Sequence, residues 1–340
     1  MGISYIVSSY APALVKDNFI VKTFYKPTKN IEVKLDKDGI PLAHYFMKDD
    51  GKEVGIQRNP VITAEQASIF YDLYKVNNNE SAKIYFLNNV NWLLDNALPK
   101  GNYSLLQYTF PIPYYHLKSV WFSAMANGQA LQVLIKAHEI THDLKYLDAA
   151  KRILNAFFIE VQHGGITYKD TPNEWWYEEY ASSGKNANIS RVLNGMLFAV
   201  LGIYDYYKYT NDSDAKLLFD KGINGIKKEI SNYNNNGYSY YDILGKTASW
   251  KYHQIHVNLT KQLYDLTGEP IFSEYHELWK KHNNPSLLNI PQHIPQPGLK
   301  IFLVSTILLI SITEISFLSI LKVLNQKFFQ TRKFIDNKEK

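Results

Sequence analysis

The feature that most constrains this chain is a change in hydrophobic period at Thr63. From there to about residue 282, apolar residues recur roughly every 3.6 positions in segments joined by short polar turns. The first segment opens with a capping-box pattern, in which Thr63 would be the N-cap and the Gln66 side chain would bond back to the Thr63 backbone N–H. Seven further helices are expected at 80–97, 121–142, 145–159, 190–209, 212–231, 251–267 and 270–282. Taken in antiparallel pairs, these helices predict a mainly α protein built as an α/α-toroid or incomplete α/α barrel, with connecting loops gathered at one mouth.

The residues before Thr63 show a different pattern. Apolar side chains alternate in FIVKTFY (19–25), IEVKL (31–35) and IPLAHYF (40–46), and a DKDG turn separates the last two. Such alternation is typical of short antiparallel strands. We therefore expect a β-rich N-terminal module over residues 1–60 and a helical domain over residues 61–282.

Proline marks the end of the helical region. Residues 283–298 hold four prolines and a glycine and are expected to form an extended linker. An apolar run follows at 301–321, about the 20 residues that cross a bilayer, with Glu314 as its only charge. We expect a transmembrane helix over 299–324, acting as a C-terminal membrane anchor, and a basic tail over 325–340. An amphipathic or core helix is the alternative, because Ser, Thr and Glu dilute the run.

The sequence leaves open on which side of the membrane the large domain lies. The basic residues after the predicted span favour a tail in the cytoplasm, which would place the large domain on the other side of the membrane. The N-terminus has neither a charged leader nor a long apolar stretch of the secretory kind, which favours a domain that stays in the cytoplasm.

Composition excludes several classes of function. Of the net charge of +5, residues 301–340 contribute six basic and three acidic side chains, which leaves +2 for the first 300 residues. This nearly neutral body lacks the basic footprint of nucleic-acid binding. The chain has no cysteine, so disulfides, thiolate catalysis and Cys-based metal sites are excluded. Its 26 Tyr and 17 Phe supply rings of the kind that line sugar-binding sites.

The stretch HEITH at 138–142 matches a zinc-peptidase motif, with His138 and His142 as ligands and Glu139 as general base. The sequence that follows predicts a turn and a new helix, which would leave His142 at a helix end. The glycine and third histidine of the extended motif are replaced by Lys145 and Asp148. We therefore expect no metal site and no cofactor.

The stretch WWYEEYA at 175–181 surrounds two adjacent carboxyl groups with three aromatic rings. Burial by Trp175, Trp176 and Tyr177 would raise the pKa of Glu179 toward that of a useful base. In a regular strand Glu179 and Tyr180 would point to opposite faces, so a shared site requires an irregular backbone here. The polar and small residues on either side favour such a backbone.

Further phenol and imidazole groups follow in two later stretches. YYDI contains Tyr241, and WKYHQIH contains Tyr252 together with His253 and His256 at helical i,i+3 spacing. These groups could transfer protons. The alternative is that they are buried polar groups satisfied inside the protein.

These stretches together resemble a known family. WFSAMANGQALQVLIKA, GGI, WWYEEYA, RVLNGMLFAVLGIYDYY, YYDI and WKYHQIH have an order and spacing similar to the C-terminal catalytic domain of D-glucuronyl C5-epimerases, over about residues 104–282. Those enzymes convert glucuronate to iduronate within heparan-type polysaccharides. The resemblance implies a helical catalytic domain beside β-rich structure and an acidic polysaccharide as substrate. The sequence leaves open whether that substrate is a heparosan-like chain, another uronate-containing envelope glycan or a lipid-linked oligosaccharide met at the membrane. Whether the protein is a monomer or a homodimer stays open.

Carried over position by position, the resemblance implies four catalytic residues. Glu179 and Tyr180 would act on one face of the sugar, and Tyr252 or Tyr241 on the other. Epimerisation at carbon five removes a proton next to a carboxylate and returns one to the opposite face, so two groups must flank the carbon. The family's arginine shortly after the Tyr-Asp pair is absent, because Ile243, Leu244 and Gly245 follow Asp242.

The carboxylate of the substrate requires cationic or hydrogen-bonding donors, because negative charge builds up on its oxygens. Arg191, just before the Val-Leu-Asn-Gly block, is the first candidate because arginine binds carboxylates in bidentate fashion. The further candidate substrate-binding residues are Arg58, His253, His256, Trp176 and Asn194.

Two other functions stay open. A polysaccharide lyase begins with the same carbanion but expels the substituent at carbon four. A non-catalytic glycan-binding protein would use the same rings without proton transfer.

Overall fold

The computed structural model describes residues 31–182 and 189–282, and the statements on structure concern these residues. The described chain is mainly helical and forms four helical hairpins. The helices are α4 (Pro60–Asn77), α5 (Glu80–Asn96), α6 (Ala124–Thr141), α7 (Lys145–Asn155), α8 (Leu193–Thr210), α9 (Ser213–Glu229), α10 (Trp250–Thr267) and α11 (Pro270–Lys280). All eight lie where the hydrophobic period predicts them, within a few residues at each end.

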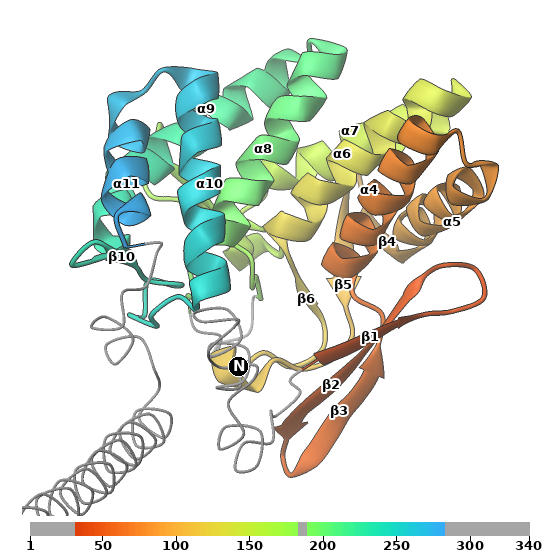
Figure 1. The fold of residues 1–340 in the computed structure, drawn as a ribbon, viewed down its shortest axis with the longest axis horizontal. Coiled ribbons are helices and arrows are strands. Elements are labelled where there is room, and N and C mark those ends of the chain that lie inside the picture. The colour runs from red at the N-terminus through yellow and green to blue at the C-terminus, as the bar shows by residue number, and fades with distance from the viewer. Residues whose placement is uncertain (1–30, 183–188, 283–340) are drawn as a thin grey trace, which may run out of the picture. The chain divides into compact units, whose positions relative to one another are not determined.

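The hairpins form an inner and an outer layer. Helices α4, α6, α8 and α10 lie side by side in this order, and each packs against the following helix of its own hairpin (Figure 1). The N-terminal ends of the inner helices point to the same side. This arrangement is that of an incomplete α/α toroid, and it brings together residues far apart in the sequence at the inner N-termini.

Helix α4 begins earlier than predicted. Asn59 is its N-cap, and the side-chain oxygen of Asn59 accepts hydrogen bonds from the backbone N–H groups of Val61 and Ile62. Pro60 occupies the first helical position, where its fixed φ and missing N–H suit a helix start. The prediction that Thr63 caps the helix is therefore wrong. Thr63 is buried within the helix instead.

Helices α6 and α8 approach each other at backbone distance. A Cβ on Gly202 would overlap the carbonyl group of Gly128, and a Cβ on Gly128 would overlap the backbone of Ala199. The small residues noticed in both sequence blocks thus permit a close helix crossing.

An antiparallel sheet with strand order β1-β2-β3 precedes the helices and consists of β1 (Ile31–Leu35), β2 (Pro41–Asp49) and β3 (Lys52–Gln57). The strands expected at 31–35 and 40–46 are confirmed. Tyr45 on β2 is buried against Phe110, with ring centroids 4.9 Å apart, and its hydroxyl accepts a hydrogen bond from Asn59. This contact joins the sheet to the start of α4.

Short strands lie where the inner helices begin. Strands β4 (Ala97–Lys100), β5 (Tyr103–Tyr108) and β6 (Trp121–Phe122) form one sheet, and β7 (Thr167–Lys169) pairs with β8 (Trp175–Tyr177). Figure 1 shows β6 leading into the N-terminal end of α6 and β5 near that of α4. A two-stranded ribbon of β9 (Asn234–Asn235) and β10 (Tyr238–Ser239) precedes α10.

Several predictions concern residues outside the described ranges. These are the strand at 19–25, the linker at 283–298, the membrane helix at 299–324 and the basic tail at 325–340. Within residues 31–182 and 189–282, no helix has the length and apolar character that a membrane crossing requires.

Candidate active site

The WWYEEYA stretch leaves its strand just before the two carboxyl residues. Strand β8 ends at Tyr177, and the backbone bends at Glu179 and Tyr180. Backbone hydrogen bonds hold both sides of the bend: the carbonyl of Glu178 accepts from the N–H of Ala124, and Ala181 exchanges two hydrogen bonds with Phe122 on β6. The irregular backbone that a shared site requires is therefore present.

The two adjacent glutamates have different surroundings. Glu178 is fully buried, and its carboxylate accepts hydrogen bonds from the Ser190 hydroxyl (2.5 Å), the Arg191 N–H (3.0 Å) and the Tyr180 N–H (3.2 Å). It therefore fastens the loop before α8 to the end of β8. Glu179 is also buried, but its Oε2 has no hydrogen-bond partner.

Burial, followed by the negative charge of Glu178, raises the pKa of Glu179 to about 8. A carboxyl group with this pKa exchanges protons near neutral pH, which is what a general acid or base requires. Glu178 is fixed by its hydrogen bonds and has a structural role, whereas Glu179 has the properties of a catalytic group.

Gly195, in the first turn of α8, makes room for the Glu179 carboxyl group. A Cβ on Gly195 would overlap Oε2 and Cβ of Glu179. The neighbouring residue Asn194 is buried, its amide nitrogen lies 3.9 Å from the Met125 sulfur, and its Oδ1 has no partner. The Asn-Gly pair of the sequence block thus lies directly beside the catalytic candidate.

The three tyrosines expected to act with Glu179 lie around it. The rings of Tyr241 and Tyr252 are 4.7 Å apart between centroids. Burial and the charge of Glu179 raise the pKa of Tyr180, Tyr241 and Tyr252. Hydrogen bonding with Tyr241 lowers the pKa of Tyr180 and of Tyr252 in part, and hydrogen bonding with Tyr180 lowers that of Glu179. Hydrogen bonds therefore connect the four side chains in a row, from Glu179 to Tyr180, from Tyr180 to Tyr241 and from Tyr241 to Tyr252.

The rings that border this cluster are not those expected from the sequence. Tyr180 packs against Tyr115 and Trp121, with ring centroids 4.6 and 5.3 Å apart. The charge of Glu179 also acts on Tyr108 and Tyr115. Tyr108 alternates inward on β5 and could have been noticed on that ground, whereas nothing in the sequence near Tyr115 indicated its place.

Lys246 is a cation at the cluster that the sequence reasoning missed. Its Nζ lies 4.0 Å from the ring centroid of Tyr114 and 5.0 Å from that of Tyr241. The surrounding protein partly removes its ammonium group from water, which lowers its pKa, while the charges of Asp242 and Glu179 raise it. The residue lies four positions after Asp242, in the region where the resembled family has an arginine, and that spacing was the available signal.

Asp242 holds the turn that carries Tyr241 and Lys246. Its fully buried carboxylate accepts hydrogen bonds from the N–H groups of Leu244 and Lys246, both at 3.1 Å, and from the Tyr115 hydroxyl at 2.8 Å. In the sequence, Asp242 was noted only as the residue that follows Tyr241.

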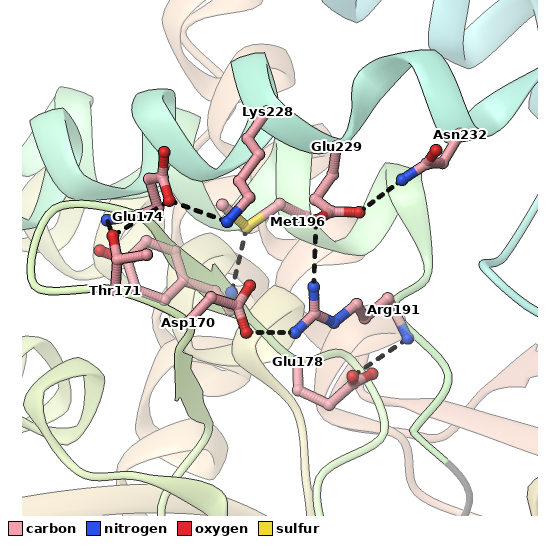
Figure 2. A network of polar contacts seen from close by, with 10 residues as sticks. Asp170, Thr171, Glu174, Glu178, Arg191, Met196, Lys228, Glu229 and Asn232 are labelled. Atoms are coloured by element: carbon pink, nitrogen blue, oxygen red, sulfur yellow. Dashed lines mark hydrogen bonds and ion pairs between the residues drawn. The ribbon is translucent and has the colours of Figure 1, made fainter.

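Arg191 is engaged elsewhere, as Figure 2 shows. Its Nη2 lies 2.6 Å from Asp170 Oδ1, its Nη1 lies 3.7 Å from Glu229 Oε1, and its backbone N–H donates to Glu178. Its guanidinium group also lies over the ring of Trp176. Because its guanidinium group already pairs with Asp170 and Glu229, we assign Arg191 a structural role and not a role in binding substrate.

The remaining substrate-binding candidates also have internal partners. His253 and His256 are fully buried, and the Nδ1 atoms of both contact the Ser239 hydroxyl, at 2.9 and 2.8 Å. Burial lowers the pKa of His256 to about 3, which keeps its ring neutral. Trp176 is fully buried and stacks on Tyr233. These three side chains cannot contact a sugar as they stand.

Arg58 lies between the end of β3 and the start of α4 and contacts the N-terminal sheet. Its Nη2 lies 2.6 Å from Asp36 Oδ2, and Asp36 also accepts hydrogen bonds from the N–H groups of Asp38 and Ile40. Arg58 thus holds the turn between β1 and β2.

The HEITH stretch does not form a metal site in the described structure. Helix α6 ends at Thr141, and His142 is its C-cap in a left-handed conformation, as the sequence predicted. Glu139 binds Tyr71 and Lys75, and His138 Nδ1 lies 2.7 Å from the Tyr209 hydroxyl. Residues 31–182 and 189–282 contain no group of three His, Cys, Asp or Glu side chains that could hold a metal ion.

The fold resembles that of two sugar epimerases. Cellobiose 2-epimerase from Bacillus thermoamylovorans B4167 is 12% identical with a TM-score of 0.53, and the match covers 82% of this chain and 71% of that one. A sugar epimerase from a ruminal bacterium is 14% identical with a TM-score of 0.50, covering 82% and 73%. The protein therefore has the α/α toroid fold of the class that includes these epimerases.

Sequence comparison identifies the family. Residues 100–281 match the family described as D-glucuronyl C5-epimerase C-terminus. The D-glucuronyl C5-epimerase of Caenorhabditis elegans is 29% identical over 208 residues, covering 55% of this chain and 33% of that protein. An uncharacterized protein of Methanocaldococcus jannaschii is 29% identical over 295 residues, covering 82% and 92%.

The chain belongs to the D-glucuronyl C5-epimerase family and is an isomerase, a carbohydrate epimerase. The match spans one third of the length of the nematode relative.

Proposed function

We propose that the protein converts D-glucuronate residues of an acidic polysaccharide, or of a lipid-linked oligosaccharide, to L-iduronate by proton exchange at carbon five. The observation that supports this most is the grouping of one buried carboxyl group with three phenols. Glu179 hydrogen-bonds to Tyr180, and its charge raises the pKa of Tyr241 and Tyr252, whose rings pack against each other. Glu179 has a pKa of about 8, so its ionised form is available near neutral pH to accept a proton.

The tyrosines are suited to act as acids. Because burial and Glu179 raise their pKa values above that of a free phenol, Tyr241 and Tyr252 keep their protons. In the proposed reaction Glu179 takes the proton from carbon five, and Tyr252 or Tyr241 donates one to the opposite face of the ring. The phenolate then regains a proton from Glu179 through the interacting hydroxyl groups of Tyr180 and Tyr241, which restores the starting state.

Lys246 is the proposed partner of the substrate carboxylate. The carbanion spreads its charge onto the carboxylate oxygens, and a cation placed there lowers the barrier. Lys246 lies over the ring of Tyr241 and is exposed to solvent, and the charge of Glu179 contributes to its pKa. Together these side chains supply an acid, a base and a cation, so the proposed mechanism uses no metal and no cofactor.

Deuterium exchange tests the proposal directly. The protein is incubated in deuterated water with unsulfated glucuronate polymers, and deuterium at carbon five and iduronate content are measured by NMR. We expect both to increase while the polymer length stays unchanged. A rise in ultraviolet absorbance from an unsaturated uronate would instead support the lyase, and binding without exchange would support the glycan-binding protein.

Lys246 and Arg191 form a matched pair of substitutions. We expect Lys246→Met to lower kcat/KM for exchange about 100-fold with little change in the free energy of unfolding, because it removes one charge at the reacting carboxylate. Arg191→Met should lower the free energy of unfolding by about 3 kcal/mol, because it leaves Asp170 and Glu229 without their cation. Its folded fraction should keep its activity. The reverse pattern in denaturant titrations and kinetics would favour Arg191 as the substrate ligand.

A further inference from the structure

Three aromatic rings surround the ammonium group of Lys246. Its Nζ lies 4.0 Å from the ring centroid of Tyr114, 5.0 Å from that of Tyr241 and 6.0 Å from that of Tyr115. A cation within about 6 Å of a ring centroid is attracted by the negative charge of the ring face. Tyr114 is the nearest of the three rings and therefore contributes the largest attraction.

Rings hold this cation in place of a carboxylate. In the described part of the chain no carboxylate forms an ion pair with Lys246, and the charges of Asp242 and Glu179 act on it from further away. By contrast, Lys227 pairs with Glu269 at 2.7 Å, a contact that a bound carboxylate would have to displace. An aromatic ring attracts a cation without neutralising it. Lys246 therefore keeps its full charge for a ligand.

Tyr114 has fewer other contacts than the two remaining rings. Tyr115 is buried and its hydroxyl donates to Asp242 at 2.8 Å, and Tyr241 is buried with its ring 4.7 Å from that of Tyr252. Tyr114 is 53% exposed and packs edge-on against Tyr115, with ring centroids 4.7 Å apart. Its ring can therefore be removed with little effect on the fold.

The backbone around Tyr114 and Lys246 is fixed, but the lysine side chain is not. Tyr114 is the middle residue of the short 3-10 helix η1 (Pro113–Tyr115). The Asp242 carboxylate accepts hydrogen bonds from the Tyr115 hydroxyl and from the Lys246 N–H, and so joins this turn to the turn that carries the lysine. A flexible four-carbon stem still separates the ammonium group from that backbone. The direction of the ammonium group therefore depends on the rings that it contacts.

We propose that Tyr114 is a positioning residue, which holds the Lys246 ammonium group beside Tyr241, where it meets the carboxylate of the reacting sugar. This rests on the proposed function for the role of Lys246 as the ligand of that carboxylate. The contact between Tyr114 and Lys246 does not rest on it and can be measured without a substrate.

The electron density of the ring face distinguishes this role from simple packing. We expect Tyr114→Leu to lower kcat/KM for deuterium exchange about 10-fold, chiefly through kcat, because charge on the carboxylate grows in the transition state. Tyr114→Phe keeps a ring and should stay within about 2-fold of the wild type. Phenylalanine with one, two or three fluorine atoms at position 114 weakens the ring face while keeping its shape, so kcat/KM should fall at each step. A structural role would not follow the number of fluorine atoms.

Two further variants serve as controls. In a Lys246→Met protein, Tyr114→Leu should cause no additional loss of kcat/KM, because Tyr114 acts through Lys246. Lys83 lies 5.3 Å from the ring centroid of Tyr74, near the C-terminal end of α4. Tyr74→Leu thus removes a similar contact away from the inner N-termini and should leave kcat/KM unchanged.

NMR of the protein with 13C-labelled lysine measures the contact without catalysis. The Tyr114 ring should shift the signal of the Lys246 ε-methylene group upfield, and Tyr114→Leu should remove most of that shift. An unchanged signal, or equal kcat/KM across the fluorinated series while Lys246→Met is impaired, would overturn the inference and leave the proposed function standing. Absence of exchange in the wild-type protein would overturn the proposed function, and loss of the upfield shift in Tyr114→Leu would then still support the contact between Tyr114 and Lys246.

Discussion

Glu179→Gln is expected to reduce deuterium exchange at carbon five by about 10³-fold or more while the protein stays folded. The substitution removes the proposed base but keeps nearly the same shape, and a positioned acid or base contributes ~10²–10⁴-fold to a rate. For the wild-type protein, kcat/KM should rise with pH up to about 8, where Glu179 ionises. Exchange kinetics as a function of pH give both results.

The same substitution should stabilise the protein at alkaline pH. The pKa of Glu179 is about 8 in the folded state, above the ordinary value of 4.5. Between these values the unfolded state releases the proton that the folded state keeps, so this group lowers the free energy of unfolding as pH rises. Glutamine lacks this effect. We therefore expect Glu179→Gln to have a higher Tm than the wild type near pH 8 and the same Tm below about pH 4.

Glu178→Gln is the control for these measurements. Glu178 accepts hydrogen bonds from Ser190, Tyr180 and Arg191, and an amide NH2 group in place of one oxygen would face donors instead of accepting from them. The expected result is a free energy of unfolding lower by about 1–3 kcal/mol. If Glu179→Gln were the destabilised variant and Glu178→Gln the inactive one, the assignment of the two carboxyl groups would be wrong.

Gly195→Ala is expected to lower kcat/KM at least 100-fold without unfolding the protein. The new Cβ would overlap Oε2 and Cβ of Glu179, and the carboxyl group must turn away to make room. A displacement of about 1 Å at a reacting group costs ~10²-fold in rate. Kinetics on the folded variant, with circular dichroism to confirm its helix content, measure the effect.

Gly202→Ala is the matched control for the glycine substitution, because it lies on the same helix. Its Cβ would overlap the backbone carbonyl of Gly128, which cannot rotate aside. We expect this variant to lose stability, by about 1–3 kcal/mol for an overpacked core, and to keep its activity in the folded fraction. Normal activity in Gly195→Ala would show that Glu179 does not need its present position.

The helices were predictable because their signal is local. The 3.6-residue period predicted both ends of α5 and α10 to within one residue, because the apolar residues of the buried face recur at helical spacing in each segment. The start of α4 was misread because two capping signals lie close together and Asn59 with Pro60 prevailed over Thr63.

The candidate site was only partly predictable. Glu179, Tyr180, Tyr241 and Tyr252 came from resemblance to a family, and the structure brings these four together. The choice of cation could not be made from sequence. Arg191 had the more suitable chemistry, but its partners Asp170 and Glu229 lie 21 and 38 positions away in the chain and are revealed only by the fold.

The order in which the chain is made has a consequence for its activity. Tyr45 on β2 lies near the start of the described chain, Glu179 near its middle, and Tyr252 on the last hairpin, yet Glu179 and Tyr45 both raise the pKa of Tyr252. A nascent chain at the ribosome, or an intermediate whose last hairpin has not docked, would contain Glu179, Tyr180 and Tyr241 but would lack Tyr252 in its place beside them. The proposed proton exchange would thus require the final hairpin to be docked.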